Sequence, residues 1–515
     1  MPTIKHNHID LPVNFAGLTF SNRYARLSGQ FYAQVKPTPV RAPGLIKVNH
    51  TLAKELGLDS AVLESPDGVA MLAGNAIPPG AEPLAQAYAG HQFGYLNPQL
   101  GDGRAILLGE IVDRNGRPRD IQLKGSGPTP FSRNGDGRAA VGPVLREYIV
   151  SEAMHALGIK TTRALAAVTT GEPVYREVEL PGAILTRVAA SHVRIGTFEF
   201  FHNRDDRESI KQLADFVIDR HYPEARQATN PYRALLDAVI DAQASLVASW
   251  LHVGFIHGVM NTDNMSVSGE TIDYGPCAFM DTYDPATVFS SIDRGGRYAF
   301  GNQANIALWN LGRLAECLLH LFDDDTEQAV RKAEEQLSGF AGLFEHYWLA
   351  GMRRKIGGLT ALEDDKSLID ALLELMQINQ VDYTQSFRYL SAYLETAYLK
   401  TSHLEQSNQH KFIAQFKTHQ EALHDWLGRW KIRLEKEELP IEQLASKMRE
   451  VNPVYIPRNH RIEASIRAAV ERADYAPMYE MVEVLSKPYE EQPGMERYAE
   501  PPEPGDEVYQ TFCGT

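Results

Sequence analysis

The residues best suited to chemistry are an amide and two carboxylates near the middle of the chain. Asp263 and Asn264 end the run His257-Gly-Val-Met-Asn-Thr-Asp-Asn264, and Asp273 follows nine residues later. One amide oxygen and one carboxylate suit Mg²⁺ or Mn²⁺ bridging the phosphates of a nucleotide. We therefore expect Asn264 and Asp273 to be metal ligands. Asp263 could accept a proton from an incoming hydroxyl. Alternatively, it could support metal binding by contacting the metal ligands and not the metal itself.

The spacing of these motifs matches the catalytic loop His-Arg-Asp-x-x-x-x-Asn and the metal motif of protein kinases. In kinases the Asp two residues after the His takes the proton from the substrate hydroxyl. The corresponding residue here is Val259, which cannot accept a proton. The sequence therefore predicts a nucleotide and metal site in which ordinary phosphate transfer is altered, with His257 bracing the loop through hydrogen bonds.

The elements that must position this site precede it in the order of a kinase N-lobe. The loop Gly101-Asp-Gly-Arg104 leads into a predicted strand over 104–112. Asn115-Gly116 supplies residues for a tight hairpin, and a second strand is predicted over 120–124. A helix is predicted over 143–157, with a proline near its first turn and a glycine after its end.

Charged residues on these elements could bind the phosphates. Lys124 ends the second strand, and Glu147 in the following helix is its natural ion-pair partner. Arg187 and Arg194 lie in apolar surroundings, where two guanidinium groups could clamp a phosphate. Taken singly, a strand-end lysine, a helix glutamate or an arginine is usually a surface residue. Their order along the chain favours the functional interpretation.

Together these patterns predict an α+β, protein-kinase-like bilobal fold, with a small β-rich N-lobe containing one key helix and a larger helical C-lobe. Helices are predicted at 52–56, 237–253, 305–322 and 364–378, and a charged, helical region is predicted at 406–437. We divide the chain into an irregular N-terminal wrapping extension (1–94), the N-lobe (95–200), the C-lobe with the catalytic and metal loops (201–400), a helical C-terminal extension (401–485) and a poorly ordered, acidic, proline-rich tail (486–515).

The composition limits the binding partners and the cellular compartment that we expect for this protein. The formal net charge is −15, so a nucleic-acid backbone is not an expected partner. The most apolar stretch, 234–260, is interrupted by charged residues and indicates a buried helix, so no membrane partner is expected. The N-terminus lacks the features of a secretory signal, and three cysteines exclude a disulfide framework. We expect a cytoplasmic protein.

Several longer motifs resemble the selenoprotein O family, whose bacterial members are also known as YdiU. The resemblance extends over nearly the whole chain, and its motifs are long and specific. They are Gln122-Leu-Lys-Gly-Ser-Gly127, Gly135-Asp-Gly-Arg138, His257-Gly-Val-Met-Asn-Thr-Asp-Asn264, Ile272-Asp-Tyr-Gly-Pro276 and Asn452-Pro-Val-Tyr-Ile-Pro-Arg-Asn-His460.

The resemblance implies a kinase-like fold that binds ATP in a flipped orientation and transfers AMP to Ser, Thr or Tyr hydroxyls of protein substrates, self-modification included. Some members also transfer UMP from UTP, with Mn²⁺. Asn264 and Asp273 would bind the metal, and Asp263 would accept the proton. The implied nucleotide contacts are Gly101, Gly103, Arg104, Lys124, Asp136, Gly137, Arg187, Arg194 and Asp273. Two alternatives are a conventional kinase, which Val259 argues against, and an ATP-binding scaffold, which the retained charged residues argue against.

Two cysteines suggest a redox role. Many eukaryotic members of the family carry selenocysteine close to the chain end, where this chain has Cys513. Cys277 lies four residues after Asp273, in what would be the activation loop. We hypothesise that Cys277 and Cys513 form a disulfide that closes the site under oxidation. The alternative is a small buried Cys277 and an inert Cys513.

Overall fold

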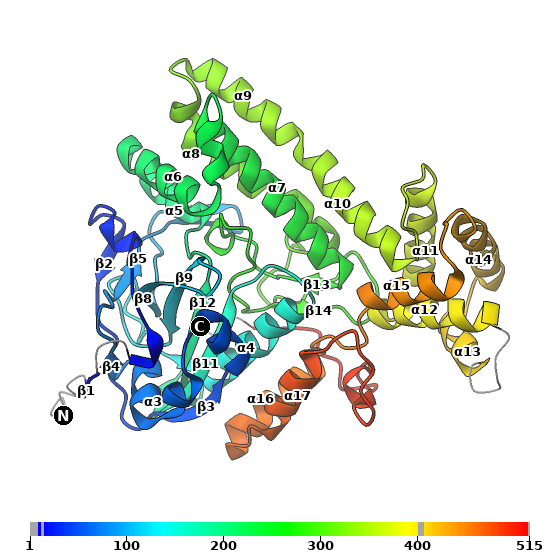
Figure 1. The fold of residues 1–515 in the computed structure, drawn as a ribbon, viewed down its shortest axis with the longest axis horizontal. Helices are drawn as coiled ribbons and strands as arrows, with labels where there is room; N and C mark the ends of the chain where they lie inside the picture. The colour runs from blue at the N-terminus through cyan, green and yellow to red at the C-terminus, as the bar shows by residue number, and fades with distance from the viewer. Residues whose placement is uncertain (1–8, 12–14, 400–405, 513–515) are drawn as a thin grey trace.

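A central antiparallel sheet forms the smaller lobe, and helices build the rest (Figure 1). The computed structural model describes residues 9–11, 15–399 and 406–512. In spatial order the strands are Tyr32–Gln34 (β2), Leu84–Gln86 (β5), Ala105–Val112 (β8), Pro118–Lys124 (β9), Glu179–Ala189 (β12), Arg163–Tyr175 (β11) and Gly44–Val48 (β3), with Ala139–Ala140 (β10) beside β12. The strands predicted over 104–112 and 120–124 are confirmed as β8 and β9. The α+β kinase-like fold is confirmed as well.

The N-terminal residues are part of this sheet, which corrects the expectation of a mostly irregular wrapping segment. They supply β2, β3 and β5, together with helices His50–Leu56 (α1), Ser60–Glu64 (α2) and Pro66–Leu72 (α3). Leu52, Leu63 and Leu72 are buried in one apolar cluster with Ile121 and Val168 of the sheet. This cluster packs the N-terminal helices against the strand that ends at Lys124.

Helix α4 (Val141–Ala156) lies against β11 and β12 and carries Glu147. It confirms the helix predicted over 143–157, and Gly158, at φ 81°, follows its end. Most of its residues are buried because helices α16 (Asn459–Arg472) and α17 (Ala476–Leu485) also pack on it. The C-terminal extension therefore holds the helix that carries Glu147.

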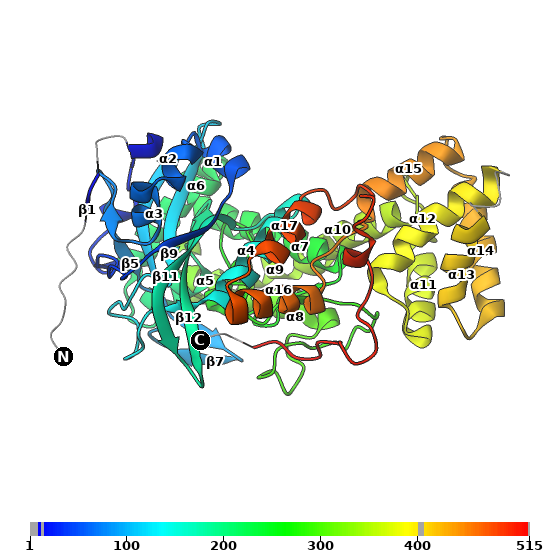
Figure 2. The ribbon, with the colours of Figure 1, turned by 90° about the horizontal axis from the view of Figure 1, so that it is seen from below.

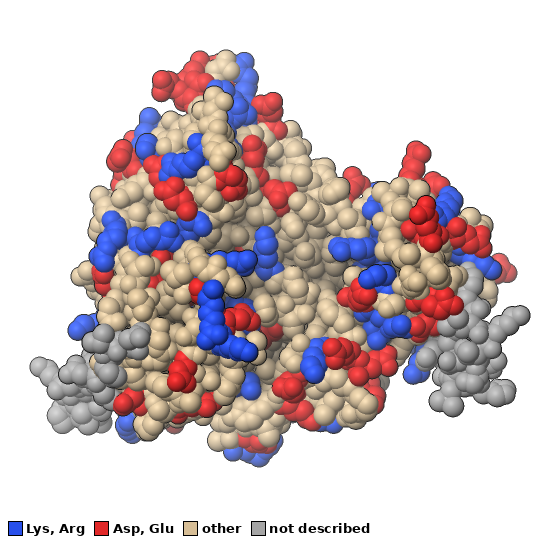
Figure 3. All heavy atoms as spheres, viewed as in Figure 1, with Lys and Arg blue, Asp and Glu red and all other residues tan. Residues whose placement is uncertain are grey.

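The larger lobe is helical. Its helices are Ile195–His202 (α5), Arg207–His221 (α6), Pro231–His252 (α7), Gln303–Phe322 (α8), Thr326–Ser338 (α9) and Phe340–Lys355 (α10). Helix α7 begins before the predicted residue 237 because Asn230 caps its N-terminus and Pro231 is its first residue. It is long and apolar enough to cross a membrane, but 67% of its apolar window is buried inside the protein, as in a core helix. In Figure 3 basic and acidic side chains are interspersed over the visible face.

After α7 the short strands Phe255–Ile256 (β13) and Ala278–Phe279 (β14) pair on either side of the catalytic loop. We call residues 273–302, between the metal motif and α8, the activation segment. Beyond α10 follow Asp365–Asn379 (α11), Tyr383–Leu399 (α12), Gln406–Gln415 (α13), Gln420–Leu434 (α14) and Ile441–Val451 (α15). The helical region expected over 406–437 is confirmed and consists of two helices, because the chain turns between them and His419 adopts φ 58°.

The tail after α17 is exposed over most of its described residues and is joined to the protein at a few points, and its poor order stays a prediction. Arg458, fully buried, donates to Asp382 (2.6 Å), Asp281 (2.5 Å) and the carbonyl of Ala499 (3.0 Å). Through these bonds it ties the tail to the activation segment. Figure 2 shows the tail running back toward the sheet. Hydrogen bonds hold it at these points although its composition is typical of disorder.

Candidate active site

One cavity of about 690 Å³ between the lobes contains every predicted nucleotide, metal and catalytic residue. These residues come from the loop before β8, the end of strand β9, the loop 125–138, helix α4, strand β12, the N-cap of α5, the catalytic loop and the metal motif. They are Gly101, Gly103, Arg104, Lys124, Asp136, Gly137, Glu147, Arg187, Arg194, Asp263, Asn264 and Asp273. Their proximity agrees with the sequence prediction, and their individual roles stay predictions.

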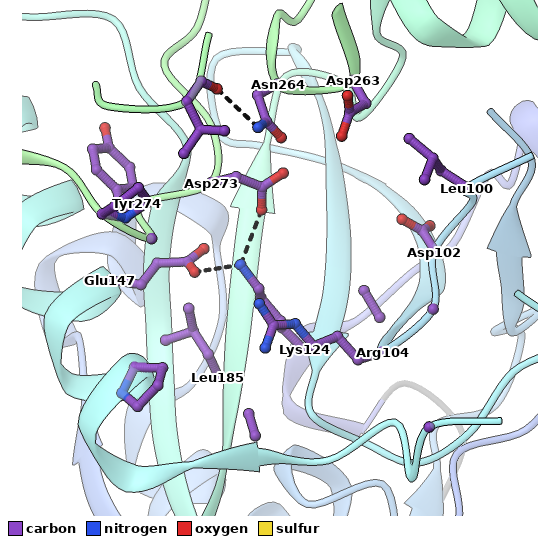
Figure 4. Close-up of a pocket in the computed structure, with 18 of the residues that line it drawn as sticks. Leu100, Asp102, Arg104, Lys124, Glu147, Leu185, Asp263, Asn264, Asp273 and Tyr274 are labelled. Atoms are coloured by element: carbon purple, nitrogen blue, oxygen red, sulfur yellow. Dashed lines mark hydrogen bonds and ion pairs between the residues drawn. The ribbon is translucent and has the colours of Figure 1, made fainter. Parts of the chain in front are cut away.

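Asp273 is the centre of the charged cluster in this cavity (Figure 4). Its carboxylate accepts hydrogen bonds from Lys124 Nζ (2.9 Å), Arg187 Nη1 (2.7 Å) and Arg194 Nη1 (2.6 Å). Burial alone would raise the pKa of Asp273, but the three cations together hold it well below its usual value. The carboxylate is therefore ionised, as a metal ligand must be.

Glu147 joins this cluster from helix α4. Its carboxylate accepts from Lys124 Nζ (2.6 Å) and Arg187 Nη1 (3.1 Å). Arg187 also donates to Gln122 Oε1 through Nε (3.1 Å) and Nη2 (2.7 Å), so its orientation is set from strand β9. The predicted pair of Lys124 and Glu147 is present, and the sequence did not reveal the part played by Gln122.

Asn264 is oriented by the catalytic loop itself. Its Nδ2 donates to the carbonyl of Val259 (2.9 Å), and Figure 4 shows its side chain facing Asp273. With the amide nitrogen engaged, the Oδ1 atom remains for a cation. Mg²⁺ in nucleotide sites is held by one or two protein oxygen ligands together with substrate phosphates. The amide of Asn264 and the carboxylate of Asp273 fit this donor set.

Asp263 is 7% exposed and has one carboxylate oxygen that no other described residue contacts by a hydrogen bond. Its Oδ2 accepts a 3.3 Å bond from Gln92 Nε2, while Oδ1 is the unpartnered atom. Burial raises the pKa of Asp263 to about 7, although the positive charge of Arg194 acts to lower it. A buried carboxylate in the lining of a cavity, with its pKa raised toward neutral, is suited to accept a proton.

A short hairpin from the N-terminal part of the chain covers Asp263, and sequence reasoning missed it. Its strands are Gly90–Gln92 (β6) and Tyr95–Asn97 (β7). A Cβ atom at Gly90 would lie 2.4 Å from Asp263 Oδ1, so only glycine allows this approach. His91 N donates to Thr262 Oγ1 (2.7 Å). Glycines on both sides of His-Gln-Phe were the signal available in the sequence.

The glycines of the 101–104 loop let another loop pack closely against it, and their contact with a nucleotide stays a prediction. A Cβ atom at Gly101, which has φ 72°, would lie 2.3 Å from the ring of Phe131, and one at Gly103 would lie 2.9 Å from the Phe131 carbonyl. In the described structure, these missing side chains let the loop 125–138 approach the 101–104 loop. Between the glycines, Asp102 is buried and accepts from Gln86 N (3.1 Å) and Gln122 Nε2 (3.2 Å).

Asp136 lies at the edge of the cavity and is already engaged. Arg176, at the turn between β11 and β12, donates to both of its carboxylate oxygens (2.8 and 3.0 Å). This ion pair lowers the pKa of Asp136. The sequence gave no indication of Arg176, because its partner lies on another hairpin. The pair holds the 125–138 loop beside the cavity.

His257 and Cys277 are both buried. His257 Nε2 is 2.9 Å from the carbonyl of Ile272, so the histidine braces the loop that leads to Asp273, as expected. Cys277 lies in the apolar core beside β14. Cys513 lies outside the described residues, and a disulfide between the two cysteines stays a prediction.

Comparison with known proteins agrees with this geometry. The family model described as "Protein adenylyltransferase SelO" matches residues 14–486. "Protein nucleotidyltransferase YdiU" of Rhizobium meliloti strain 1021 is 60% identical over 496 residues, which cover 96% of this chain and 99% of the relative. The proteins of the same name from Bradyrhizobium sp. strain BTAi1 and Methylorubrum populi are 60% and 59% identical, with the same coverage. The chain therefore belongs to the SelO family.

Proposed function

We propose that this protein is a protein adenylyltransferase that moves AMP from ATP to Ser, Thr or Tyr hydroxyls of protein substrates in the cytoplasm. The observation that carries the proposal is the position of the possible proton acceptor in the catalytic loop, which differs from its position in kinases. Val259 occupies the position of the kinase base, and Asp263 places a buried carboxylate in the lining of the same cavity. A proton acceptor is thus available, but at a different place from that in a kinase.

Several charged residues of the cavity have roles in the proposed transfer. The substrate hydroxyl oxygen bonds to the α-phosphorus of ATP and its proton passes to the carboxylate of Asp263. The bond from the α-phosphorus to the oxygen bridging to the β-phosphate breaks, and pyrophosphate leaves. Lys124, Arg187 and Arg194 stabilise the charge that develops on the phosphates.

A divalent cation belongs to this proposal. Asn264 and Asp273 would hold Mg²⁺ or Mn²⁺, which when bound supplies positive charge beside the phosphates. Since Asp273 engages three cationic side chains, phosphate oxygens would replace it as partner of some of them when the nucleotide binds. The flipped orientation of ATP, which brings the α-phosphorus toward Asp263, and the use of UTP are part of the same proposal.

The test is incubation of the purified protein with a divalent cation, a protein acceptor and ATP labelled on either the α- or the γ-phosphate. Covalent label from the α-phosphate alone is expected, and Asp273→Ala should abolish it. Asp263→Asn should bind nucleotide as the wild type does and transfer more slowly, by a factor of about 100 to 10,000. Label from the γ-phosphate alone would identify a kinase, and binding without either label would identify a scaffold.

A further inference from the structure

Near the described end of the C-terminal tail, one residue, Thr511, pairs with the activation segment through main-chain hydrogen bonds of the β type. Thr511 N donates to the carbonyl of Phe289 (2.7 Å), and Ser291 N donates to the carbonyl of Thr511 (3.1 Å). Together these bonds form a parallel bridge between Ser290 and Thr511. The activation segment therefore presents a strand edge, and the chain's own tail occupies it.

This edge lies at the mouth of the active-site cavity. Ile292, directly after the edge, and Phe512, directly after Thr511, both line the cavity although they are 57% and 68% exposed. The Thr511 hydroxyl donates to the carbonyl of Pro276, another residue of the cavity lining. A polypeptide in the place of the tail would thus bring its next residue to the opening that an acceptor hydroxyl must enter.

The contact is local and separable from the rest of the tail. Upstream, the tail is anchored by Arg458 at Ala499 and by the buried ring of Tyr498. Most residues between 500 and 510 are exposed, Tyr509 by 73%, and Thr511 is then buried again at 2%. The edge also contains Ser290 Oγ, which is buried and has no hydrogen-bond partner among the described residues. The bridge can open without unfolding the tail anchors.

We propose that the edge 289–291 is the docking site for the polypeptide chain of the protein substrate, which binds as an extended strand in place of Thr511. The inference rests on the proposed transfer of AMP to proteins. Main-chain pairing supplies affinity irrespective of the partner's side chains. Such pairing suits an enzyme whose acceptors share a hydroxyl group and little else. The tail competes for the same edge.

Proline substitutions in the full-length chain test this competition. Thr511→Pro removes the N–H that donates to Phe289, and Tyr509→Pro is the matched control at an exposed tail position. The acceptor is a degenerate peptide library with a fixed central Ser, Thr or Tyr, labelled from α-labelled ATP. We expect Thr511→Pro to lower the KM for peptide about tenfold, since the bonds that Thr511 donates to Phe289 through its N–H and to Pro276 through its hydroxyl no longer compete. The KM for ATP should be unchanged, and Tyr509→Pro should match the wild type in both constants.

A second substitution acts on the edge itself. In the Thr511→Pro background, where the tail no longer competes, Ser291→Pro removes the N–H that a substrate would use, so the KM for peptide should rise while the KM for ATP stays the same. A merely structural effect of this change would alter both constants. Unchanged KM for peptide in Thr511→Pro overturns the proposal, as does a KM for peptide that Ser291→Pro leaves unchanged or lowers in that background.

A binding measurement separates this proposal from the proposed function, because it needs no turnover. A fluorescent peptide with the sequence of residues 503–512 is titrated into wild type and Thr511→Pro. Tighter binding to Thr511→Pro, by about tenfold, supports the docking edge. Loss of that binding when the peptide is N-methylated at its Thr511 position supports it further. Equal binding to both proteins overturns the docking edge, whether or not AMP transfer is observed.

Discussion

Replacing Gly90 with alanine is expected to slow AMP transfer about 100-fold without weakening nucleotide binding. A Cβ atom at Gly90 lies 2.4 Å from Asp263 Oδ1 and 2.8 Å from its Cβ and Cγ, whereas ordinary van der Waals contact begins at 3.4 Å. The β6–β7 hairpin and Asp263 must therefore separate by about 1 Å. A misplacement of about 1 Å at a reacting group costs about 100-fold in rate, which sets the expected loss.

The assay is the initial rate of transfer from α-labelled ATP at saturating nucleotide, with the Kd for ATP measured by calorimetry. Gly29→Ala is the matched control, because a Cβ atom there meets nothing within 4 Å. The control should behave as wild type in both measurements. Gly90→Ala should change the rate alone, because the hairpin contacts Asp263 from outside the cluster of Lys124 and the arginines.

A double variant identifies the cause of the loss. Gly90→Ala combined with Asp263→Ala should transfer no more slowly than Asp263→Ala alone, because the carboxylate that the new methyl group displaces is already absent. Losses that multiply would show that Gly90→Ala acts through another group. A Gly90→Ala protein with the wild-type rate would refute the inference that this hairpin holds Asp263 in place.

Three further predictions concern stability and redox state. Lys355→Met should raise the free energy of unfolding by roughly 4 kcal/mol at pH 7, because burial lowers the pKa of the native ammonium from 10.5 to about 7. Between pH 7 and pH 10.5 the unfolded chain binds more protons than the native protein does. The stability gained by Lys355→Met should therefore shrink as the pH rises toward 10.5. Equal denaturant midpoints at pH 7 would contradict this. Arg458→Met should lower the free energy of unfolding by about 3–5 kcal/mol, since two carboxylates lose their buried cation, while the exposed Arg467→Met should leave the thermal midpoint unchanged. Oxidised protein should contain a Cys277–Cys513 disulfide in a nonreducing peptide map, and its absence there would exclude that switch.

The charged cluster could be predicted from sequence because each of its members lies on a recognisable element. Lys124 ends an alternating strand, Glu147 follows in a helix with clear ends, and Asp273 lies in a motif of known spacing. The strand β11 was missed because it is rich in alanine, which has low β-propensity, so only its pairing in the sheet makes it a strand.

The contacts around Asp263 could not be predicted in the same way. The hydrogen bond from Gln92 to Asp263 joins residues 171 apart in the sequence, and the strand that carries Gln92 has three residues. So short a strand has no detectable periodicity. The contact of the tail with the activation segment could not be predicted for a related reason. Its proline and acid content indicates disorder, but Thr511 is held through main-chain atoms, which composition does not report.

The activation segment is held from both sides by the C-terminal part of the chain. Arg458 fixes it at Asp281, and Thr511 fixes it at Ser290. In many kinases, a phosphate paired with arginine orders this segment. Here buried ion pairs are present without any modification, and Lys124 already contacts both Glu147 and Asp273. A catalytic cluster assembled in advance needs no ordering step for nucleotide chemistry. Control of activity is then best placed where the chain is easily displaced, and the bridge at Thr511, made by two main-chain hydrogen bonds at the cavity mouth, meets that condition.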